Sequence, residues 1–158
     1  MKRCPYPIET LLPHARPMIL IDEIVGYGEH FLTSALTIRP GLPFFKPGRG
    51  IAAHVALEWM AQTCGAFAGA QARDAGEEIR LGLLLGTRDF SSTVTWFSEG
   101  QRLEVTATRL YIDGQIGAFD CAVHCSDQPQ PVARAQLTVY QPDDAAALLA
   151  GQATRIAT

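Results

Sequence analysis

Hydrophobic and small residues run almost without a break from Val55 to Ala70, and at helical spacing they cover every side rather than one stripe. This pattern predicts one long helix, over about residues 53–72, that is buried all round. The run is about 16 residues long and is too short to span a bilayer. Glu58 and Gln62 interrupt it. The pattern places Glu58 in the centre of the protein, where an unpaired carboxylate is costly and therefore indicates acid–base chemistry.

The remainder of the chain is patterned mainly as strands. Asp113-Gly114 is a strong hairpin signal, and Gly82 and Gly86 predict a bend or a bulge. Residues 39–50 hold three prolines and three glycines and predict a loop. A short helical turn is expected before Pro13. The expected turn and strands are Ile8–Leu12, Met18–Val25, His30–Ile38, Ile79–Phe90, Arg102–Ile112, Gln115–Cys125 and Pro131–Tyr140.

One buried helix among mostly antiparallel strands predicts an α+β fold in which a curved sheet wraps the helix. The order of elements resembles the hotdog fold. We expect a single domain over residues 1–158, with a core over about 7–141. The tail, residues 142–158, is Ala-rich and forms either a terminal helix or a frayed end. The sheet has an open edge, so we expect two chains to associate through it as a dimer.

Composition and charge argue against several classes of function. A net charge of -3 and a pI near 5.8, with no Lys/Arg run, argue against nucleic-acid binding. No segment has the pattern of a signal peptide or the length of a transmembrane helix, so we expect a cytoplasmic protein without membrane contact. No metal-binding array, phosphate loop or dinucleotide fingerprint occurs, and no cofactor is expected. We interpret the four cysteines as thiols in a reducing compartment: Cys4, Cys64, Cys121 and Cys125.

Two motifs carry a resemblance to a known family. Leu11-Leu-Pro-His-Ala-Arg-Pro-Met-Ile-Leu-Ile-Asp-Glu-Ile24 resembles the N-terminal signature of FabZ-type 3-hydroxyacyl-[acyl-carrier-protein] dehydratases. Leu57-Glu-Trp-Met-Ala-Gln-Thr-Cys-Gly65 is similar to the start of their central helix. Arg88-Asp-Phe90 and Glu99-Gly-Gln101 fall where the family has a strand–loop segment. The resemblance covers about residues 7–140 and implies a hotdog dehydratase.

One departure from the family pattern is important. FabZ-type enzymes carry a catalytic histidine in the loop before the helix glutamate, and here the matching position is Phe44. No histidine lies in that loop, and Ala52-Ala53 replace the family's Pro-Gly before the helix. The chain therefore resembles a divergent branch, the dehydratase-like proteins of aryl-polyene and related polyketide pathways.

The resemblance implies roles for individual residues. Glu58 matches the general acid that protonates the leaving 3-hydroxyl group. His54 either replaces the missing base or is a structural histidine bonded locally or to Glu58. The amides of Ala53 and His54 are expected to polarise the thioester carbonyl. Gln62 either orients Glu58 or is a buried amide bonded to backbone. Phe44, Ala53 and Gln62 are expected at the substrate, and His14 is interpreted as structural.

Three functions remain in competition. The first is a dehydratase, a lyase acting on 3-hydroxyacyl thioesters carried by acyl carrier protein or CoA. The second is a subunit without independent activity, because FabZ-type sites combine a histidine from one chain with a glutamate from the other. Such a chain would pair with a FabZ-like partner rather than with itself. The third is a hotdog acyl thioesterase. The sequence does not identify the acyl or aryl group, its length or its carrier.

Overall fold

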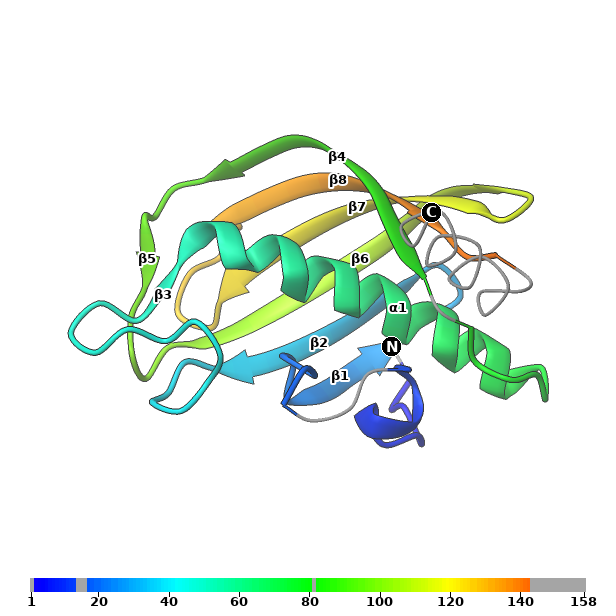
Figure 1. Cartoon of the computed structure of the whole chain (residues 1–158), viewed down its shortest axis with the longest axis horizontal. Helices are drawn as coiled ribbons and strands as arrows, with labels where there is room; N and C mark the ends of the chain where they lie inside the picture. The colour runs from blue at the N-terminus through cyan, green and yellow to red at the C-terminus, as the bar shows by residue number, and fades with distance from the viewer. Residues whose placement is uncertain (1, 14–16, 81, 143–158) are drawn as a thin grey trace, which may run out of the picture.

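The computed structural model describes residues 2–13, 17–80 and 82–142. Within them, six strands form one sheet in the order β1-β2-β6-β7-β8-β4, and every neighbouring pair is antiparallel. The sheet curves around a single long helix, α1 (Figure 1). The strands are β1 Glu23–Tyr27, β2 Phe31–Thr37, β4 Leu83–Ser92, β6 Arg102–Asp113, β7 Ile116–Cys125 and β8 Ala133–Tyr140. The predicted α+β hotdog architecture is confirmed.

The predicted helix is present, and it ends two residues later than expected, at Asp74. A 3-10 turn, η2 (Ala53–Val55), leads into α1 (Ala56–Asp74). The helix ends where Gly76 adopts a φ of 72°, which favours glycine. The N–H groups of Gly76 and Glu77 donate to the carbonyls of Arg73 and Ala72, at 3.1 and 2.8 Å, and so close a Schellman motif. None of the helices among the described residues is long and apolar enough to cross a membrane.

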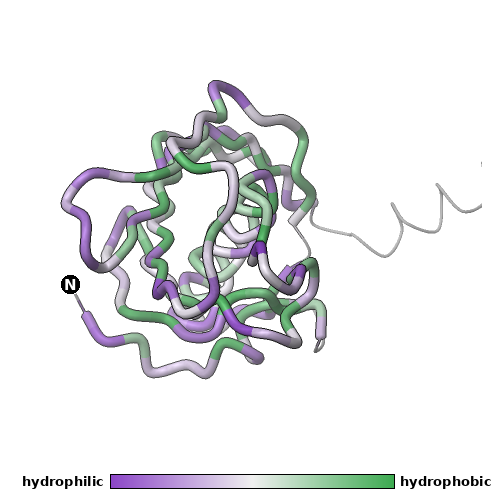
Figure 2. Tube along the Cα trace, turned by 90° about the vertical axis from the view of Figure 1, so that its left-hand side faces the viewer, coloured by the Kyte–Doolittle hydropathy of each residue, from purple (hydrophilic) through white to green (hydrophobic). Residues whose placement is uncertain are grey.

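The core lies between α1 and the concave face of the sheet. The helix packs on β2, β6, β7 and β8. Trp59, Met60 and Phe67 are fully buried on its inner side. Viewed from the end of the molecule, hydrophilic residues gather at the outer loops (Figure 2). The alternating residues Cys121, Val123 and Cys125 of β7 point into this core, as a half-buried strand requires.

The expectation that the helix is buried all round is wrong. One face of α1 is open to solvent: Glu58 is exposed, and five residues on the same side are partly exposed, namely Leu57, Ala61, Gly65, Ala68 and Ala72. The sheet covers the opposite side only. Because alanine and glycine occupy most of the open face, the sequence pattern there does not differ from that of a buried face.

Two short strands were not predicted. β3 (Ile51–Ala52) pairs with β5 (Trp96–Phe97) beside the start of the helix. Gly50 makes this pairing possible, because a Cβ atom at this position would collide with the Phe97 carbonyl. Its φ of 97° also favours glycine. Two-residue strands carry no periodicity that a sequence could reveal.

The main strands lie within two residues of their predicted bounds, apart from the starts of β1 and β4. β1 begins five residues later than the expected Met18 and extends to Tyr27, and β4 begins four residues later than the expected Ile79. The expected helical turn is a 3-10 turn, η1 (Ile8–Thr10). A register shift between Leu84 and Gly86 confirms the irregularity predicted for β4. His14, Leu81 and the tail residues 143–158 lie outside the described residues, so the expectations for them stay predictions.

Candidate active site

The start of α1 is built from three segments that converge there. The loop over residues 39–50 leads into β3, and η2 then turns the chain into the helix. The N-cap residues of η2 and α1, Ala52 and Val55, provide no side-chain cap to the backbone. The Ala53 N–H donates to the Thr95 carbonyl at 2.9 Å. A substrate carbonyl would therefore have to displace this bond or use the amide of His54.

Glu58 lies in the first turn of α1 and points to the open helix face. Its side chain is exposed, contrary to the expectation that it sits in the centre of the protein. The carboxylate is consequently available to a substrate or to a second chain that covers this face. Burial within one subunit therefore does not explain why a carboxylate occurs in this apolar helix.

Gln62 holds Glu58 from the next turn of the helix. Its Nε2 atom lies 3.4 Å from Glu58 Oε1 and also donates to the Met18 carbonyl at 2.7 Å. Its Oε1 atom accepts from the Leu20 N–H at 2.8 Å. The two backbone groups fix the orientation of the amide, because one is an acceptor and the other a donor. Gln62 is therefore a buried amide bonded to backbone, and it also contacts Glu58. That it orients Glu58 stays a prediction.

The bonds from Gln62 to Met18 and Leu20 were not foreseen from the sequence. Gln62 belongs to the helix motif, whereas Met18 and Leu20 belong to the N-terminal motif that carries the resemblance. The two motifs meet at one side chain. The presence of both motifs in one chain was the only sign of this contact in the sequence. It does not show that Gln62 bonds to Met18 and Leu20.

His54 lies in the turn before the helix, where its side chain is exposed. No hydrogen bond or ion pair joins it to Glu58 among the described residues. The structural alternative in which His54 is bonded to Glu58 therefore does not occur in this structure. Its role as a base stays a hypothesis, because both groups are open to solvent and no hydrogen bond from the described part of the chain orients the imidazole.

Phe44, which stands where the related enzymes have a histidine, adopts a φ of 69° and is 60% exposed. This region of backbone space is strained for a bulky residue, and the cost is on the order of 1–3 kcal/mol. Such strain in an exposed loop is typical of functional segments. Phe44 cannot accept a proton, so at this position the loop contributes shape and apolar surface only.

A pocket of about 770 Å³ opens beside these residues, and we call it the helix-start pocket. Lys46 lines it, and the guanidinium of Arg49 lies 5.5 Å from the centre of the Trp96 ring, a cation–π arrangement. The pocket thus combines apolar walls with nearby cations. Its other lining residues include Phe44, Ala53, His54, Phe90 and Trp96.

Among the described residues, no group of three or more His, Cys, Asp or Glu side chains could hold a metal ion. All four cysteines are free, which agrees with their interpretation as thiols. Cys64 and Cys121 are buried with their sulfur atoms 3.7 Å apart. Burial raises the pKa of the Cys64 thiol well above its ordinary value, so the thiol stays neutral.

Comparison with protein families gives one match. The ApeP-like family, described as ApeP dehydratase, matches residues 6–150. No protein among the curated sequences matches the chain.

Solved structures with a similar fold include the dehydratase heterocomplex ApeI:P from Xenorhabdus doucetiae. It is 26% identical, with a TM-score of 0.83, and the match covers 91% of this chain and 96% of that chain. A hypothetical thioesterase from Streptococcus pneumoniae, solved with coenzyme A, is 9% identical with a TM-score of 0.60, over 76% and 84% of the two chains. The PaaI protein of the E. coli phenylacetic acid degradation operon is 13% identical with a TM-score of 0.59, over 75% and 81%. The last two show the fold alone.

Proposed function

Because the chain belongs to the ApeP-like dehydratase family, we propose that it is one subunit of a dehydratase for 3-hydroxyacyl thioesters in aryl-polyene biosynthesis. The site is completed by a histidine-bearing, FabZ-like partner. The observation that carries this proposal is the pairing of an exposed Glu58 with Phe44 at the position of the missing histidine. A chain built this way has the acid of the reaction and lacks the usual base.

The reaction is the elimination of water. A histidine of the partner removes a proton from the carbon next to the thioester carbonyl. The electron pair of that C–H bond forms the new double bond, and the bond to the 3-hydroxyl oxygen breaks. Glu58 gives its proton to this oxygen, which leaves as water. We expect the amide of His54 to donate to the thioester oxygen while negative charge develops on it.

A partner has a surface to bind. The open face of α1 carries Glu58, and the edge strand β4 exposes Leu84 and Leu85, at 44% and 56%. Edge strands with exposed apolar residues are prone to pair with another chain. The similarity to a solved dehydratase heterocomplex favours an unlike partner. A homodimer stays the alternative, in which His54 would have to act as the base.

The proposed substrate is an acyl thioester carried by acyl carrier protein or by CoA. Both carriers contain phosphate, and Lys46 and Arg49 place cations at the helix-start pocket. Arginine and lysine side chains therefore fit either carrier and do not discriminate between them. The reaction uses proton transfer alone, so the proposal requires no cofactor. The cytoplasmic location expected from the sequence stays a prediction.

The test is reconstitution of the pair. This chain and a histidine-bearing FabZ-like partner are mixed with a 3-hydroxyacyl thioester, and formation of the conjugated enoyl thioester is followed by absorbance. Glu58→Gln should lower the rate by about 10²–10⁴. Glu78→Gln changes an exposed carboxylate away from the site and is the matched control.

The same assay distinguishes dehydration from the thioesterase alternative. That alternative rests on the exposure of Glu58 to solvent, because hydrolysis needs water at the site. Hydrolysis releases a free thiol, whereas dehydration keeps the thioester intact. Release of thiol without enoyl product would favour the thioesterase. An unchanged rate of dehydration in the Glu58→Gln variant would remove Glu58 from the mechanism.

A further inference from the structure

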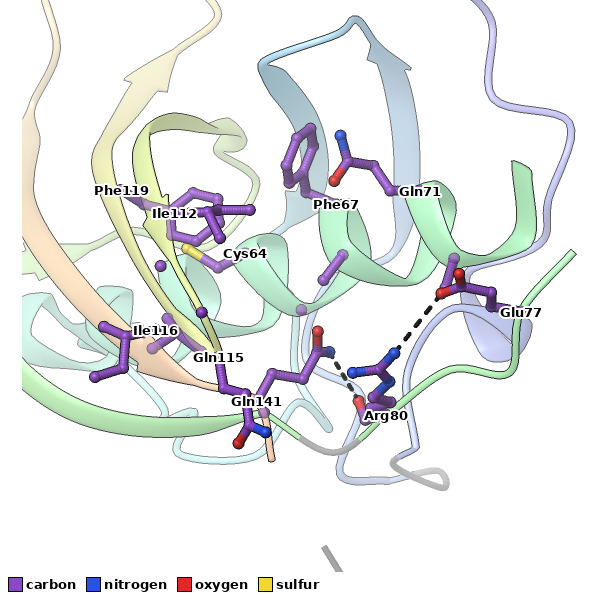
Figure 3. A pocket seen from close by; sticks show the side chains of 17 residues that line it. Cys64, Phe67, Gln71, Glu77, Arg80, Ile112, Gln115, Ile116, Phe119 and Gln141 are labelled. Atoms are coloured by element: carbon purple, nitrogen blue, oxygen red, sulfur yellow. Dashed lines mark hydrogen bonds and ion pairs between the residues drawn. The ribbon is translucent and has the colours of Figure 1, made fainter. Parts of the chain in front are cut away.

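A cavity of about 510 Å³ lies beside the second half of α1 (Figure 3). The helix, the β6–β7 hairpin and the end of β8 line it. Its rim is open to solvent, because Ile112 and Ile116 are 56% and 38% exposed. A molecule the size of water needs only roughly 10–15 Å³, so small solutes can enter. The cavity is therefore a route from solvent to the side chains on its inner wall.

Cys64 lies on this inner wall. It is the one cysteine among the described residues that line the cavity. Figure 3 shows its side chain directed from α1 toward the β6–β7 hairpin, near Ile112 and Phe119. Cys64 is otherwise buried, with 1% of its surface exposed. The cavity is consequently the path by which a small molecule reaches this sulfur.

Cys121 stands directly behind Cys64. It belongs to β7 and is fully buried, and its Sγ atom lies 3.7 Å from that of Cys64. Since a disulfide bond is about 2.05 Å long, each sulfur must move by roughly 0.8 Å to form one. The Cys64 side chain has free space on its cavity side, so a movement of this size requires no repacking there. The two thiols are close enough to be joined.

We propose that Cys64 and Cys121 are a site of oxidation by small hydroperoxides. Cys64 reacts first, from the cavity, and Cys121 then closes a disulfide bond that ties α1 to β7. The dehydration mechanism uses neither thiol, so this inference is independent of the proposed function.

The chemistry takes two steps. The Cys64 sulfur attacks one oxygen of hydrogen peroxide and the O–O bond breaks. The sulfur is oxidised by two electrons to a sulfenic acid, and the other oxygen leaves with the thiol proton as water. The Cys121 sulfur then attacks the Cys64 sulfur, the S–O bond breaks, and the oxygen leaves with the Cys121 proton as a second water. Two thiols and one peroxide thus give one disulfide and two waters.

The surroundings of the pair set the relative rates of these steps. Burial, and then the hydrogen bond with Cys121, raises the pKa of the Cys64 thiol well above its ordinary value. The thiolate is the nucleophile, so the first step is slow and requires peroxide in excess. The second step is fast, because the partner sulfur is already in contact. The sulfenic acid is therefore converted to the disulfide before a second peroxide oxidises it further.

The test is peptide mapping of the folded chain. The reduced protein is treated with excess hydrogen peroxide, the remaining thiols are alkylated, and tryptic peptides are identified by mass spectrometry. Trypsin releases Cys64 within residues 50–73 and Cys121 within residues 110–134. A link between these two peptides that dithiothreitol removes is the expected product. Fragmentation of the linked peptides assigns the bond, because Cys125 shares the second peptide with Cys121.

Three variants test the order of the steps, and circular dichroism verifies that each is folded. In Cys121→Ser, Cys64 should accumulate as sulfenic and then sulfinic acid, because no thiol is left to close the bond. In Cys64→Ser, oxidation of Cys121 should fall by on the order of tenfold or more, because access decides which thiol reacts. Cys125→Ser, at another buried position of β7, is the matched control and should form the link at the wild-type rate.

The wild-type chain alone decides the proposal if a variant does not fold. Absence of the link in the oxidised wild type, or a link that forms only after unfolding in urea, would overturn it. A bond from Cys64 to Cys125 would do the same. Undiminished oxidation of Cys121 in a folded Cys64→Ser variant would overturn the order of the steps and the route through the cavity.

Discussion

The side-chain amide of Gln62 lies 3.4 Å from the carboxylate of Glu58, one helical turn away. The same amide is held by the Met18 carbonyl and the Leu20 N–H, so it is anchored before any substrate arrives. The exposed carboxylate of Glu58 thus lies next to a side chain, Gln62, whose orientation is fixed. The N-terminal motif, which contains Met18 and Leu20, is in this way part of the support of the site.

Replacement of Gln62 should destabilise the fold. Gln62→Met keeps a similar length but leaves the buried Leu20 N–H and the Met18 carbonyl without their partner. The free energy of unfolding should fall by about 2–4 kcal/mol, because each unsatisfied buried group costs about 1–3 kcal/mol. Urea denaturation followed by circular dichroism measures this. Gln136→Met, at an exposed position of β8, should change the free energy of unfolding by less than about 0.5 kcal/mol. Equal effects of the two variants would show that the Gln62 bonds carry no stability.

Phe44→His should add activity to this chain on its own. The residue has a φ of 69°, a conformation that histidine adopts more readily than phenylalanine. The variant would place a base where the related enzymes have one, so two identical chains could form a complete site. We expect enoyl formation at least about tenfold above the wild-type chain alone. The double variant Phe44→His/Glu58→Gln should return to the wild-type level, and activity that survives in it would contradict the assignment of Glu58.

Leu85→Lys should weaken association with the partner. Leu85 lies at the irregularity of the edge strand β4 and is 56% exposed. A lysine on an edge strand opposes pairing with another strand, so the dissociation constant should rise by on the order of tenfold or more. Leu110→Lys is a matched control, since Leu110 also lies at a register shift, in β6, and is 52% exposed. Analytical ultracentrifugation measures both. An identical loss of affinity in the two variants would argue against the β4 edge.

The alkaline stability of the protein should depend on Tyr27. Burial, and then the hydrogen bond to Asp74 at 2.9 Å, raises the pKa of Tyr27 from 10.0 to about 12. The folded state therefore holds this proton more tightly than the unfolded state. Its contribution to stability is complete below pH 10 and is lost as the pH rises toward 12. Tyr27→Phe should flatten the decrease in unfolding free energy over this interval, whereas Tyr111→Phe, at an exposed position, should not. Parallel curves for Tyr27→Phe and the wild type would refute the assignment.

The long elements could be predicted from the sequence because their periodicity is strong. The run from Val55 to Ala70 and the signal at Asp113-Gly114 lie in a helix and a hairpin, as expected. The exposure of Glu58 could not be predicted. Ala61, Gly65 and Ala68 fit a buried helix face and an open one equally well, since small residues reveal little about what covers them.

Contacts between segments that are distant in the sequence could not be predicted either. The bond from Ala53 to Thr95 depends on a two-residue strand pair that has no pattern of its own. A cavity of about 510 Å³ is lined by both Cys64 and Gln141, residues that only the fold brings together. The candidate site could be predicted by residue type, through the resemblance, but not by geometry.

Turnover of the purified chain, alone and with an equimolar histidine-bearing FabZ-like partner, tests the shared site most directly. A single 3-hydroxyacyl thioester and continuous absorbance of the enoyl product are sufficient. The shared site predicts that the chain alone is nearly inert and that the mixture is active. The activity of the mixture should depend on Glu58 and tolerate His54→Ala. Robust dehydration by the chain alone, abolished by His54→Ala, would contradict the shared site and make His54 the base.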